Sequence, residues 1–151
     1  MRRKRIMVVG TRGCGKTSLV NYLNNYDGPL RRTQDTIYGK ETIDVPSAFI
    51  ENASMYKHMI ALAQDAWVIV AMVDQSWCHE VYSHGFARAF RCPVIGVIGK
   101  SDLSPENEEV CRKQLKKIGI REPYFRISNK DGSGLEELKS YLEELKKGKG
   151  A

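Results

Sequence analysis

The chain has 151 residues and a formal net charge of +6, which predicts one domain with a full hydrophobic core. Its 42% hydrophobic and 28% charged residues exclude a disordered, collagen-like or coiled-coil chain. The longest apolar run, Trp67–Val73, is far shorter than the ~20 residues of a membrane-spanning helix. Only the short apolar run Ile6–Val9 follows the basic N-terminus before Gly10, which is too short for a secretory signal, so we expect a cytoplasmic protein with no membrane partner.

Short apolar runs alternate with helical patterns, which predicts an α/β fold of βαβ units around a parallel sheet. Strands are expected at Arg5–Val9, Gln34–Tyr38, Glu41–Asp44, Trp67–Val73, Val94–Ile98 and Tyr124–Ile127. Helices are expected at Lys16–Leu23, Asn52–Ala63 and Tyr82–Phe90. Two more helices are expected from the capping sequence Ser104-Pro-Glu to Gly119 and from the capping box Ser133-Gly-Leu-Glu to Leu145, followed by a flexible tail over 146–151.

The excess positive charge is dispersed along the chain, and no basic face interleaved with aromatic residues indicates nucleic-acid binding. The charge fits a solvated surface and a phosphate ligand, so no nucleic-acid partner is expected. The four cysteines form no C-x-x-C pair, which favours reduced structural thiols over a metal site, even with His79 beside Cys78.

A glycine-rich segment follows the first predicted strand. It runs Gly10-Thr-Arg-Gly-Cys-Gly-Lys-Thr17 and matches G-x-x-x-x-G-K-[ST] in full. Its glycines let the backbone wrap a phosphate, with N–H groups pointing inward at the positive end of the next helix. Lys16 would reach the β- and γ-phosphates, and the Thr17 hydroxyl would bind Mg²⁺. The predicted nucleotide contacts here are Gly10, Arg12, Gly13, Cys14, Gly15, Lys16, Thr17 and Ser18.

Two aspartates compete for a second Mg²⁺-binding role. Asp44 ends a predicted strand, and its carboxylate could hold Mg²⁺ through water. Asp74 directly follows Trp67–Val73, whereas only Ile43 is strongly apolar before Asp44. The pattern of an apolar run followed by an aspartate therefore favours Asp74.

A second polar segment, Gly99-Lys-Ser-Asp102, follows the strand predicted at Val94–Ile98. A carboxylate in this x-K-x-D pattern can accept hydrogen bonds from both N1–H and the 2-amino group of guanine, which adenine lacks. The lysine stem can lie along the base plane, and residues after the last strand could support base recognition. The predicted base contacts are Lys100, Asp102, Leu103, Ser128, Asn129 and Lys130.

Together these residues resemble small Ras-like P-loop GTPases, and more narrowly the ethanolamine- and propanediol-utilisation NTPase family encoded with bacterial microcompartments. The resemblance runs from about Arg5 to Leu145 and implies a Ras-like three-layer sandwich. Its sheet would be mostly parallel and six-stranded, with an antiparallel edge strand. The resemblance is carried by Arg32-Thr-Gln34, Ile43-Asp-Val-Pro46, Phe49-Ile-Glu-Asn52, Gly85-Phe-Ala87, Pro93-Val-Ile-Gly-Val-Ile-Gly-Lys-Ser-Asp-Leu103 and Ser133-Gly-Leu-Glu-Glu-Leu138.

The resemblance also assigns roles to individual residues. It moves the Mg²⁺-binding role from Asp74 to Asp44, and it makes Thr33 the switch threonine, a metal ligand and catalytic residue alongside Lys16. It implies Mg²⁺-dependent binding of a nucleoside triphosphate, with GTP favoured over ATP, and slow hydrolysis.

Four residues depart from the usual GTPase pattern. Ser47 replaces the glycine of D-x-P-G, and Ala48 cannot orient a water, which predicts slow hydrolysis. Gly99 stands where such GTPases usually have Asn or Thr, so a side-chain tie between the base loop and the phosphate loop is missing and base selectivity should be modest. Arg12 would either crowd the γ-phosphate or add positive charge to it.

Two other functions remain open from the sequence. Members of the resembled family have been assigned acetate kinase activity, for which Arg12, Arg31 or Arg32 could supply a cation near the γ-phosphate. Alternatively, the large side chains of the segment Gln75–Tyr82 could form a partner surface on a nucleotide-bound interaction module. Packing of this loop onto its own domain is the slightly favoured interpretation of the same side chains. The partner expected from the resemblance is a microcompartment shell or enzyme.

Overall fold

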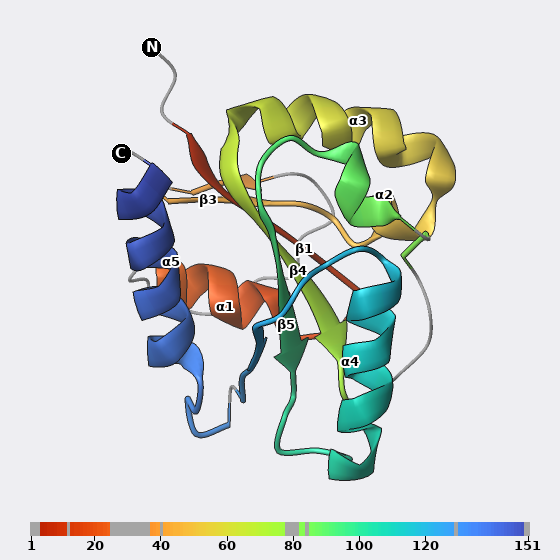
Figure 1. The fold of residues 1–151 in the computed structure, drawn as a ribbon, viewed down its shortest axis with the longest axis vertical. Helices are drawn as coiled ribbons and strands as arrows, with labels where there is room; N and C mark the ends of the chain where they lie inside the picture. Colours follow the sequence, from red (N-terminus) through yellow and green to blue (C-terminus); the bar gives the residue numbers. More distant parts are fainter. Residues whose placement is uncertain are drawn as a thin grey trace.

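A computed structural model describes residues 4–11, 13–24, 37–39, 41–77, 82–83, 85–128 and 130–149 (Figure 1). Its strands are β1 (Arg5–Gly10), β2 (Ile37–Tyr38), β3 (Thr42–Asp44), β4 (Ala66–Asp74), β5 (Val94–Gly99) and β6 (Tyr124–Arg126). Its α-helices are α1 (Lys16–Leu23), α2 (Ala48–Glu51), α3 (Tyr56–Leu62), α4 (Glu108–Lys117) and α5 (Leu135–Lys149). Single 3₁₀ turns are η1 (Ala53–Met55), η2 (Ala63–Asp65), η3 (Phe86–Ala89) and η4 (Pro105–Asn107).

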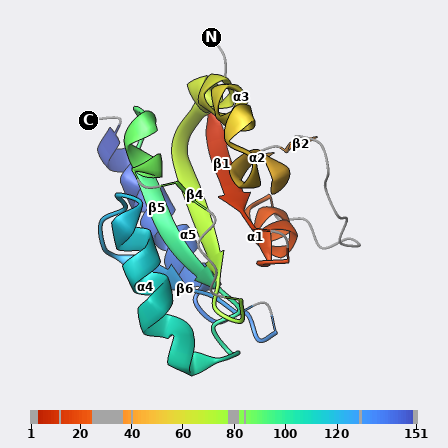
Figure 2. The ribbon, with the colours of Figure 1, turned by 90° about the vertical axis from the view of Figure 1, so that its right-hand side faces the viewer.

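The strands form one sheet in the order β2-β3-β1-β4-β5-β6. β3, β1, β4, β5 and β6 run parallel, and β2 pairs antiparallel with β3 at the edge. Figure 2 shows the central strands β1, β4 and β5 side by side. The predicted mostly parallel sheet is confirmed. Of the strand predicted at Gln34–Tyr38, the described residues Ile37 and Tyr38 form β2, and residues 34–36 lie outside the described part of the chain.

Helices cover both faces of the sheet, so the protein has the predicted three layers. On one face, Leu19 of α1 and Leu138 of α5 pack with the β-strands in one core cluster. On the other face, Met59 of α3 and Leu115 of α4 belong to a second cluster. All nine residues of β4 are buried, as expected for a central strand with helices on both sides.

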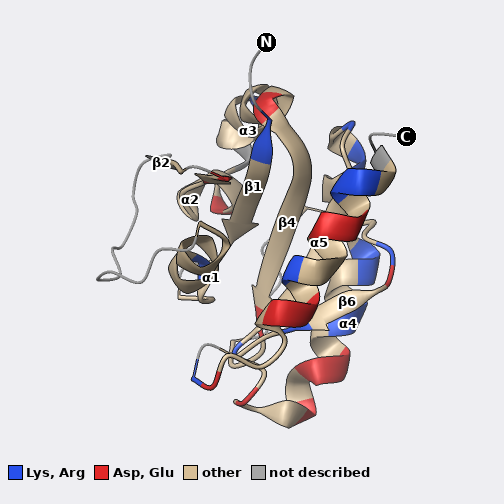
Figure 3. Cartoon of the chain, turned by 90° about the vertical axis from the view of Figure 1, so that its left-hand side faces the viewer, with Lys and Arg blue, Asp and Glu red and all other residues tan. Residues whose placement is uncertain are grey.

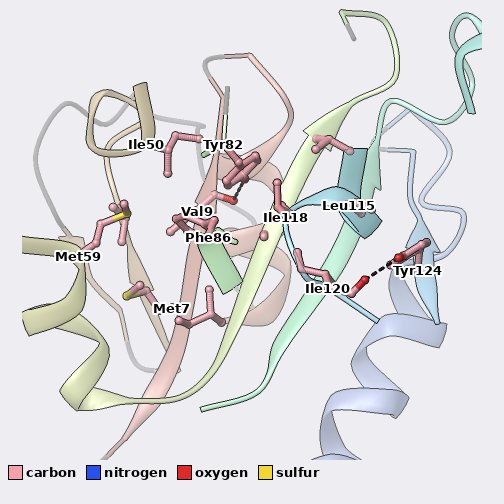
Figure 4. Packing of buried hydrophobic residues seen from close by; sticks show 14 of the residues in the cluster. Met7, Val9, Ile50, Met59, Tyr82, Phe86, Leu115, Ile118, Ile120 and Tyr124 are labelled. Carbon is pink, nitrogen blue, oxygen red and sulfur yellow. Dashed lines mark hydrogen bonds between the residues drawn. The ribbon is translucent and has the colours of Figure 1, made fainter. Parts of the chain in front are cut away.

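The connection from β4 to β5 contains a 3₁₀ turn instead of the predicted helix over 82–90. Two aromatic residues fill the space beside the sheet (Figure 4). Tyr82 and Phe86 meet edge to face with ring centroids 4.9 Å apart, and the Tyr82 hydroxyl donates to the Met72 carbonyl at 2.7 Å. Ala87 N–H donates to the Ile118 carbonyl at 2.9 Å, which ties this turn to the end of α4. This segment is therefore held in place by aromatic packing and by two hydrogen bonds, and the described part of it contains a 3₁₀ turn and no α-helix.

The helix predicted at Asn52–Ala63 is confirmed in outline, because η1, α3 and η2 follow one another without a break from Ala53 to Asp65. Only Asn52 lies outside it: its backbone is extended, and its side chain accepts hydrogen bonds from Ser54. Three other local predictions were wrong. Ser104 has a left-handed backbone and makes no capping hydrogen bond, and α4 begins only at Glu108 after a 3₁₀ turn. The Ser133 hydroxyl donates to Asp131, not to the first turn of α5. Residues 146–149, predicted as a tail, continue that helix.

Acidic residues lie at the N-terminal end of α4 and basic residues at its C-terminal end (Figure 3). Glu108 and Glu109 lie in its first turn, and Lys116 and Lys117 lie in its last turn, so each charge faces the helix end of opposite sign. None of the helices in the described part of the chain has the length and hydropathy needed to cross a membrane.

Candidate nucleotide-binding site

Most of the segments that carry predicted site residues meet at one edge of the sheet. Because the strands run parallel, their carboxyl ends lie together, which is where ligands bind in open α/β sheets. The glycine-rich loop follows β1, Asp44 ends β3, Asp74 ends β4, Lys100 follows β5 and Ser128 follows β6. The sheet order therefore brings together residues that are more than 100 positions apart in the sequence.

The glycine-rich loop has the backbone that the motif requires. Gly13 and Gly15 have φ angles of 80° and 98°, in the left-handed region that favours glycine. The Cys14 N–H donates to the Thr11 carbonyl at 3.2 Å, and α1 begins directly at Lys16. Thr17 and Ser18 lie in the first turn of that helix and are partly buried. Of the predicted contacts in this loop, Arg12 lies outside the described residues.

Lys16 points across the loop toward β3. Its Nζ donates to the Val45 carbonyl and lies 3.4 Å from Asp44 Oδ1. Lys16 and Asp44 are 7% and 2% exposed, so this ion pair lies in a region of low dielectric where electrostatic interactions are strong. A buried carboxylate facing the phosphate-loop lysine, with the Thr17 hydroxyl group in the helix that follows, is a set of hard oxygen donors that fits Mg²⁺. Thr33 lies outside the described residues.

Asp74 has different neighbours. Its Oδ2 lies 3.4 Å from Lys100 Nζ, and its Oδ1 accepts hydrogen bonds from Ser76 N–H at 2.8 Å and Ser76 Oγ at 2.6 Å. Asp74 therefore contacts the x-K-x-D segment, whereas Asp44 contacts the lysine of the phosphate loop. β3 and β4 both pair with β1. The apolar-run pattern favoured Asp74 because it detects burial of a strand, and it carries no information about which of the two aspartates faces Lys16.

The x-K-x-D segment is held against the loop after β6. Ser128 is 1% exposed, and its hydroxyl donates to Asp102 Oδ1 at 2.8 Å. The Lys130 N–H donates in turn to Ser128 Oγ at 3.3 Å. Asp102 and Leu103 are exposed, so Ser128 orients a carboxylate whose second oxygen stays accessible. The structure thus brings Lys100, Asp102 and Ser128 together, while Asn129 lies outside the described residues.

The phosphate loop and the x-K-x-D segment touch through their backbones. A Cβ atom on Gly99 would lie 2.3 Å from the Cys14 carbonyl oxygen, far inside van der Waals contact. The missing side chain is therefore replaced by direct backbone contact between the two loops. Burial raises the pKa of the Cys14 thiol to about 11, although nearby Lys16 lowers it, so the thiol is protonated and unreactive near neutral pH.

Ser47, which replaces a glycine of the usual pattern, is not strained. Its φ and ψ angles are −59° and −29°, in the right-handed region open to every residue. In this structure, Ser47 precedes α2, and the position needs no glycine.

Sequence reasoning missed the network behind the x-K-x-D segment. It left the segment that begins at Gln75 open between a partner surface and packing onto the domain, and it did not predict that Gln75 is fully buried and hydrogen-bonded to the x-K-x-D segment. A polar residue directly after Asp74, the last residue of a buried strand, was the available signal. Within the described residues, no group of three or more His, Cys, Asp and Glu side chains is placed to hold a metal ion.

A strand, a glycine-rich phosphate loop and a helix at the carboxyl edge of this sheet define a Ras-like P-loop protein. The fold agrees with that of a probable GTP-binding protein, engB, whose structure is matched with a TM-score of 0.67 at 21% identity, over 93% of this chain and 97% of that one. The likeness at this identity concerns the fold.

Within this class, the sequence matches the family described as "Ethanolamine utilisation - propanediol utilisation" (PduV-EutP) over residues 3–144. The chain belongs to that family. It is 31% identical to the propanediol utilization protein PduV of Citrobacter freundii, over 92% of this chain and 93% of PduV. It is 29% identical to a probable acetate kinase, EutP, of Escherichia coli K12, over 95% of this chain and 92% of EutP. The resemblance inferred from the sequence is confirmed.

Proposed function

We propose that this protein binds a Mg²⁺–nucleoside triphosphate, prefers GTP to ATP, and hydrolyses the nucleotide slowly. The observation that carries the proposal is the placement of Lys16 and the Ser128-oriented Asp102 at one edge of the sheet. One group is suited to phosphates and the other to a guanine base. Their loops touch at Gly99, so both ends of one nucleotide can be held together.

Each group has a separate task in this proposal. The loop N–H groups and Lys16 hold the phosphates at the positive end of α1, and Thr17, Asp44 and Thr33 would hold Mg²⁺, which neutralises phosphate charge when bound. Lys100 lies along the base, and Asp102 accepts hydrogen bonds from it. Ala48, at the start of α2, has no polar side chain with which to orient a water, which supports slow hydrolysis.

Asp102→Asn tests the base preference. The amide places a donor against a guanine donor, so GTP affinity should fall roughly 10- to 150-fold, the equivalent of about 1.5–3 kcal/mol for one charged hydrogen bond. ATP affinity should barely change, and xanthosine triphosphate should bind better because its 2-oxo group accepts from the new amide. Calorimetric titration of the three nucleotides in Mg²⁺ measures all of these effects.

The matched control for this test is Asp65→Asn. Asp65 ends the 3₁₀ turn η2 at the start of β4, away from the carboxyl ends of the strands, and its substitution changes the net charge equally. It should leave the order of the three affinities unchanged. A wild-type protein that prefers ATP, with Asp102→Asn indifferent to the base, would contradict the proposed GTP preference.

The Mg²⁺ role is tested by comparing Asp44→Asn with Asp74→Asn. Asp44 lies beside Lys16, and Asp74 lies beside Lys100, so only the first should weaken the Mg²⁺ dependence of triphosphate binding. A loss of roughly 10- to 100-fold in apparent Mg²⁺ affinity is expected for Asp44→Asn. Titration of Mg²⁺ at fixed fluorescent GTP analogue gives this value, and impairment in Asp74→Asn alone would reverse the assignment.

In the cell, we place this activity in the cytoplasm, in ethanolamine or propanediol utilisation beside a bacterial microcompartment. Membership of the family supports this role. Co-sedimentation with purified microcompartments, with and without GTP, tests it. Turnover of ATP that depends on added acetate would instead favour the activity in the name of the EutP relative.

A further inference from the structure

Gln75, the first residue after β4, is joined to the x-K-x-D segment by its side chain. Its Nε2 donates to the Ser101 carbonyl at 3.1 Å and to the Leu103 carbonyl at 2.7 Å. These carbonyls flank Asp102 on both sides. The side chain is fully buried, with 0% exposure, so water does not compete for these hydrogen bonds.

The backbone of Gln75 is fixed as well. Its N–H donates to the Gly99 carbonyl at 3.1 Å, which continues the β4–β5 pairing past the end of the strands. Its carbonyl accepts from Asn107 Nδ2 at 3.0 Å. Gln75 is therefore held by β5 on one side and by the turn before α4 on the other, and it forms a rigid support.

The segment that Gln75 supports has an unfavourable backbone at both ends. Lys100 and Ser104 have φ angles of 56° and 46°, in the left-handed region that non-glycine residues seldom adopt. Such conformations persist only where surrounding contacts fix them. The two hydrogen bonds from Gln75 fall between these two residues, where they oppose relaxation of the loop.

The oxygen of the Gln75 side-chain amide is in a less favourable position than the nitrogen. Its Oε1 is buried and has no hydrogen-bond partner among the described residues. An unpaired buried amide oxygen is destabilising, and an apolar side chain of the same size would avoid it. In this chain the amide donor therefore holds the two carbonyls of the loop while its own oxygen stays unpaired.

We propose that Gln75 is a positioning residue for base recognition, which acts by holding the loop that presents Asp102 to guanine. Because the amide donates to the carbonyls on both sides of Asp102, it fixes the backbone position of Asp102. The Ser128 hydroxyl then fixes the orientation of the Asp102 side chain. This inference rests on the proposed function, because it assigns the selectivity of the same site.

Gln75→Met and Gln75→Glu test the inference. Methionine keeps the length of the side chain and removes the donor, whereas glutamate places an acceptor against two carbonyl oxygens. GTP affinity should fall about tenfold or more in both variants, while affinities for ATP and for Mg²⁺–tripolyphosphate should stay within about threefold of wild type. The ratio of GTP to ATP affinity should therefore fall, which general destabilisation does not produce.

Asn24→Asp is the matched control. Asn24 directly follows the last residue of α1. Its Nδ2 also donates to two oxygens, those of the Val20 carbonyl and the Thr42 hydroxyl, each at 2.8 Å. The substitution makes the same amide-to-carboxylate change away from the base loop, so it should lower thermal stability without changing the affinity ratio. Equal weakening of GTP, ATP and tripolyphosphate binding in the Gln75 variants would overturn the inference.

Hydrogen exchange gives a second readout that needs no nucleotide. The N–H groups of Ser101 and Leu103 donate to the Ile127 and Lys100 carbonyls, and their exchange should accelerate about tenfold or more in Gln75→Met, with β1 and β4 unaffected. Unchanged exchange at these two amides would refute the positioning role directly. If wild-type protein does not prefer GTP, the proposed function fails, and this measurement still decides whether Gln75 holds the loop.

Discussion

Replacing Gly99 by alanine is expected to destabilise the protein and weaken nucleotide binding together. A Cβ atom there would lie 2.3 Å from the Cys14 carbonyl oxygen and 3.4 Å from Met72 Cε. The first contact is with backbone, so either the phosphate loop or the end of β5 must move. Overpacking of this kind costs about 1–3 kcal/mol, which for a chain of this size lowers Tm by roughly 2–12 °C.

The same displacement should reduce GTP and ATP affinity by about tenfold or more, because the loop N–H groups lose their alignment on the phosphates. Thermal unfolding followed by circular dichroism and titration with each nucleotide give the two effects. Gly148→Ala is the control: a Cβ atom there meets nothing within 4 Å, and alanine favours the helix. Its Tm should be unchanged or higher.

Gly99→Asn separates two explanations of this glycine. From the sequence alone, the glycine reads as a lost side-chain tie, so asparagine should restore base selectivity. The structure predicts the reverse, because the carbonyl of Cys14 already occupies the place of a side chain. An asparagine variant with normal Tm and sharper GTP selectivity would contradict the close packing of the two loops.

Local patterns were sufficient to predict the parallel strands and the phosphate loop. Helix α1 has the predicted bounds, Lys16–Leu23, and β4 extends the predicted Trp67–Val73 by one residue at each end. Neighbouring residues in the sequence determine both features: an apolar run predicts a strand buried on both faces, and closely spaced glycines predict a loop with left-handed φ angles. Such features depend little on the rest of the fold.

Features that depend on distant residues were not predictable in this way. The choice between Asp44 and Asp74 depends on which strand lies beside β1 on the side of Lys16, and strand order is a property of the whole sheet. The role of Gln75 depends on carbonyl groups 26 and 28 residues further along the chain. The short helix predicted over 82–90 also failed, and there Tyr82 and Phe86 pack edge to face beside a 3₁₀ turn.

Lys16→Met is expected to weaken the binding of every ligand that carries a triphosphate chain. Its ammonium group is the cation that would meet the β- and γ-phosphates, and one charged hydrogen bond is worth about 1.5–3 kcal/mol, or roughly 10- to 150-fold in affinity. GTP, ATP and Mg²⁺–tripolyphosphate should all weaken by this factor, whereas guanosine, which has no phosphate, should bind as in wild type. Calorimetric titration with the four ligands measures the pattern.

The ion pair with Asp44 adds a second effect that must be separated from the first. Methionine removes the cation 3.4 Å from a carboxylate that is 2% exposed, and breaking a buried pair commonly costs about 3–5 kcal/mol of stability. The double variant Lys16→Met/Asp44→Asn removes that buried charge, so its Tm should recover toward wild type while triphosphate binding stays weak. If triphosphate binding recovered together with Tm in the double variant, Lys16 would act by stabilising the fold. If GTP and ATP binding were unchanged in Lys16→Met, Lys16 would have no role in phosphate binding. Because Asp44→Asn alone should already weaken Mg²⁺-dependent binding, the comparison is with that single variant. Triphosphate affinity that is lower in the double variant than in Asp44→Asn, with Tm near wild type, is the result that a direct contact between Lys16 and phosphate requires.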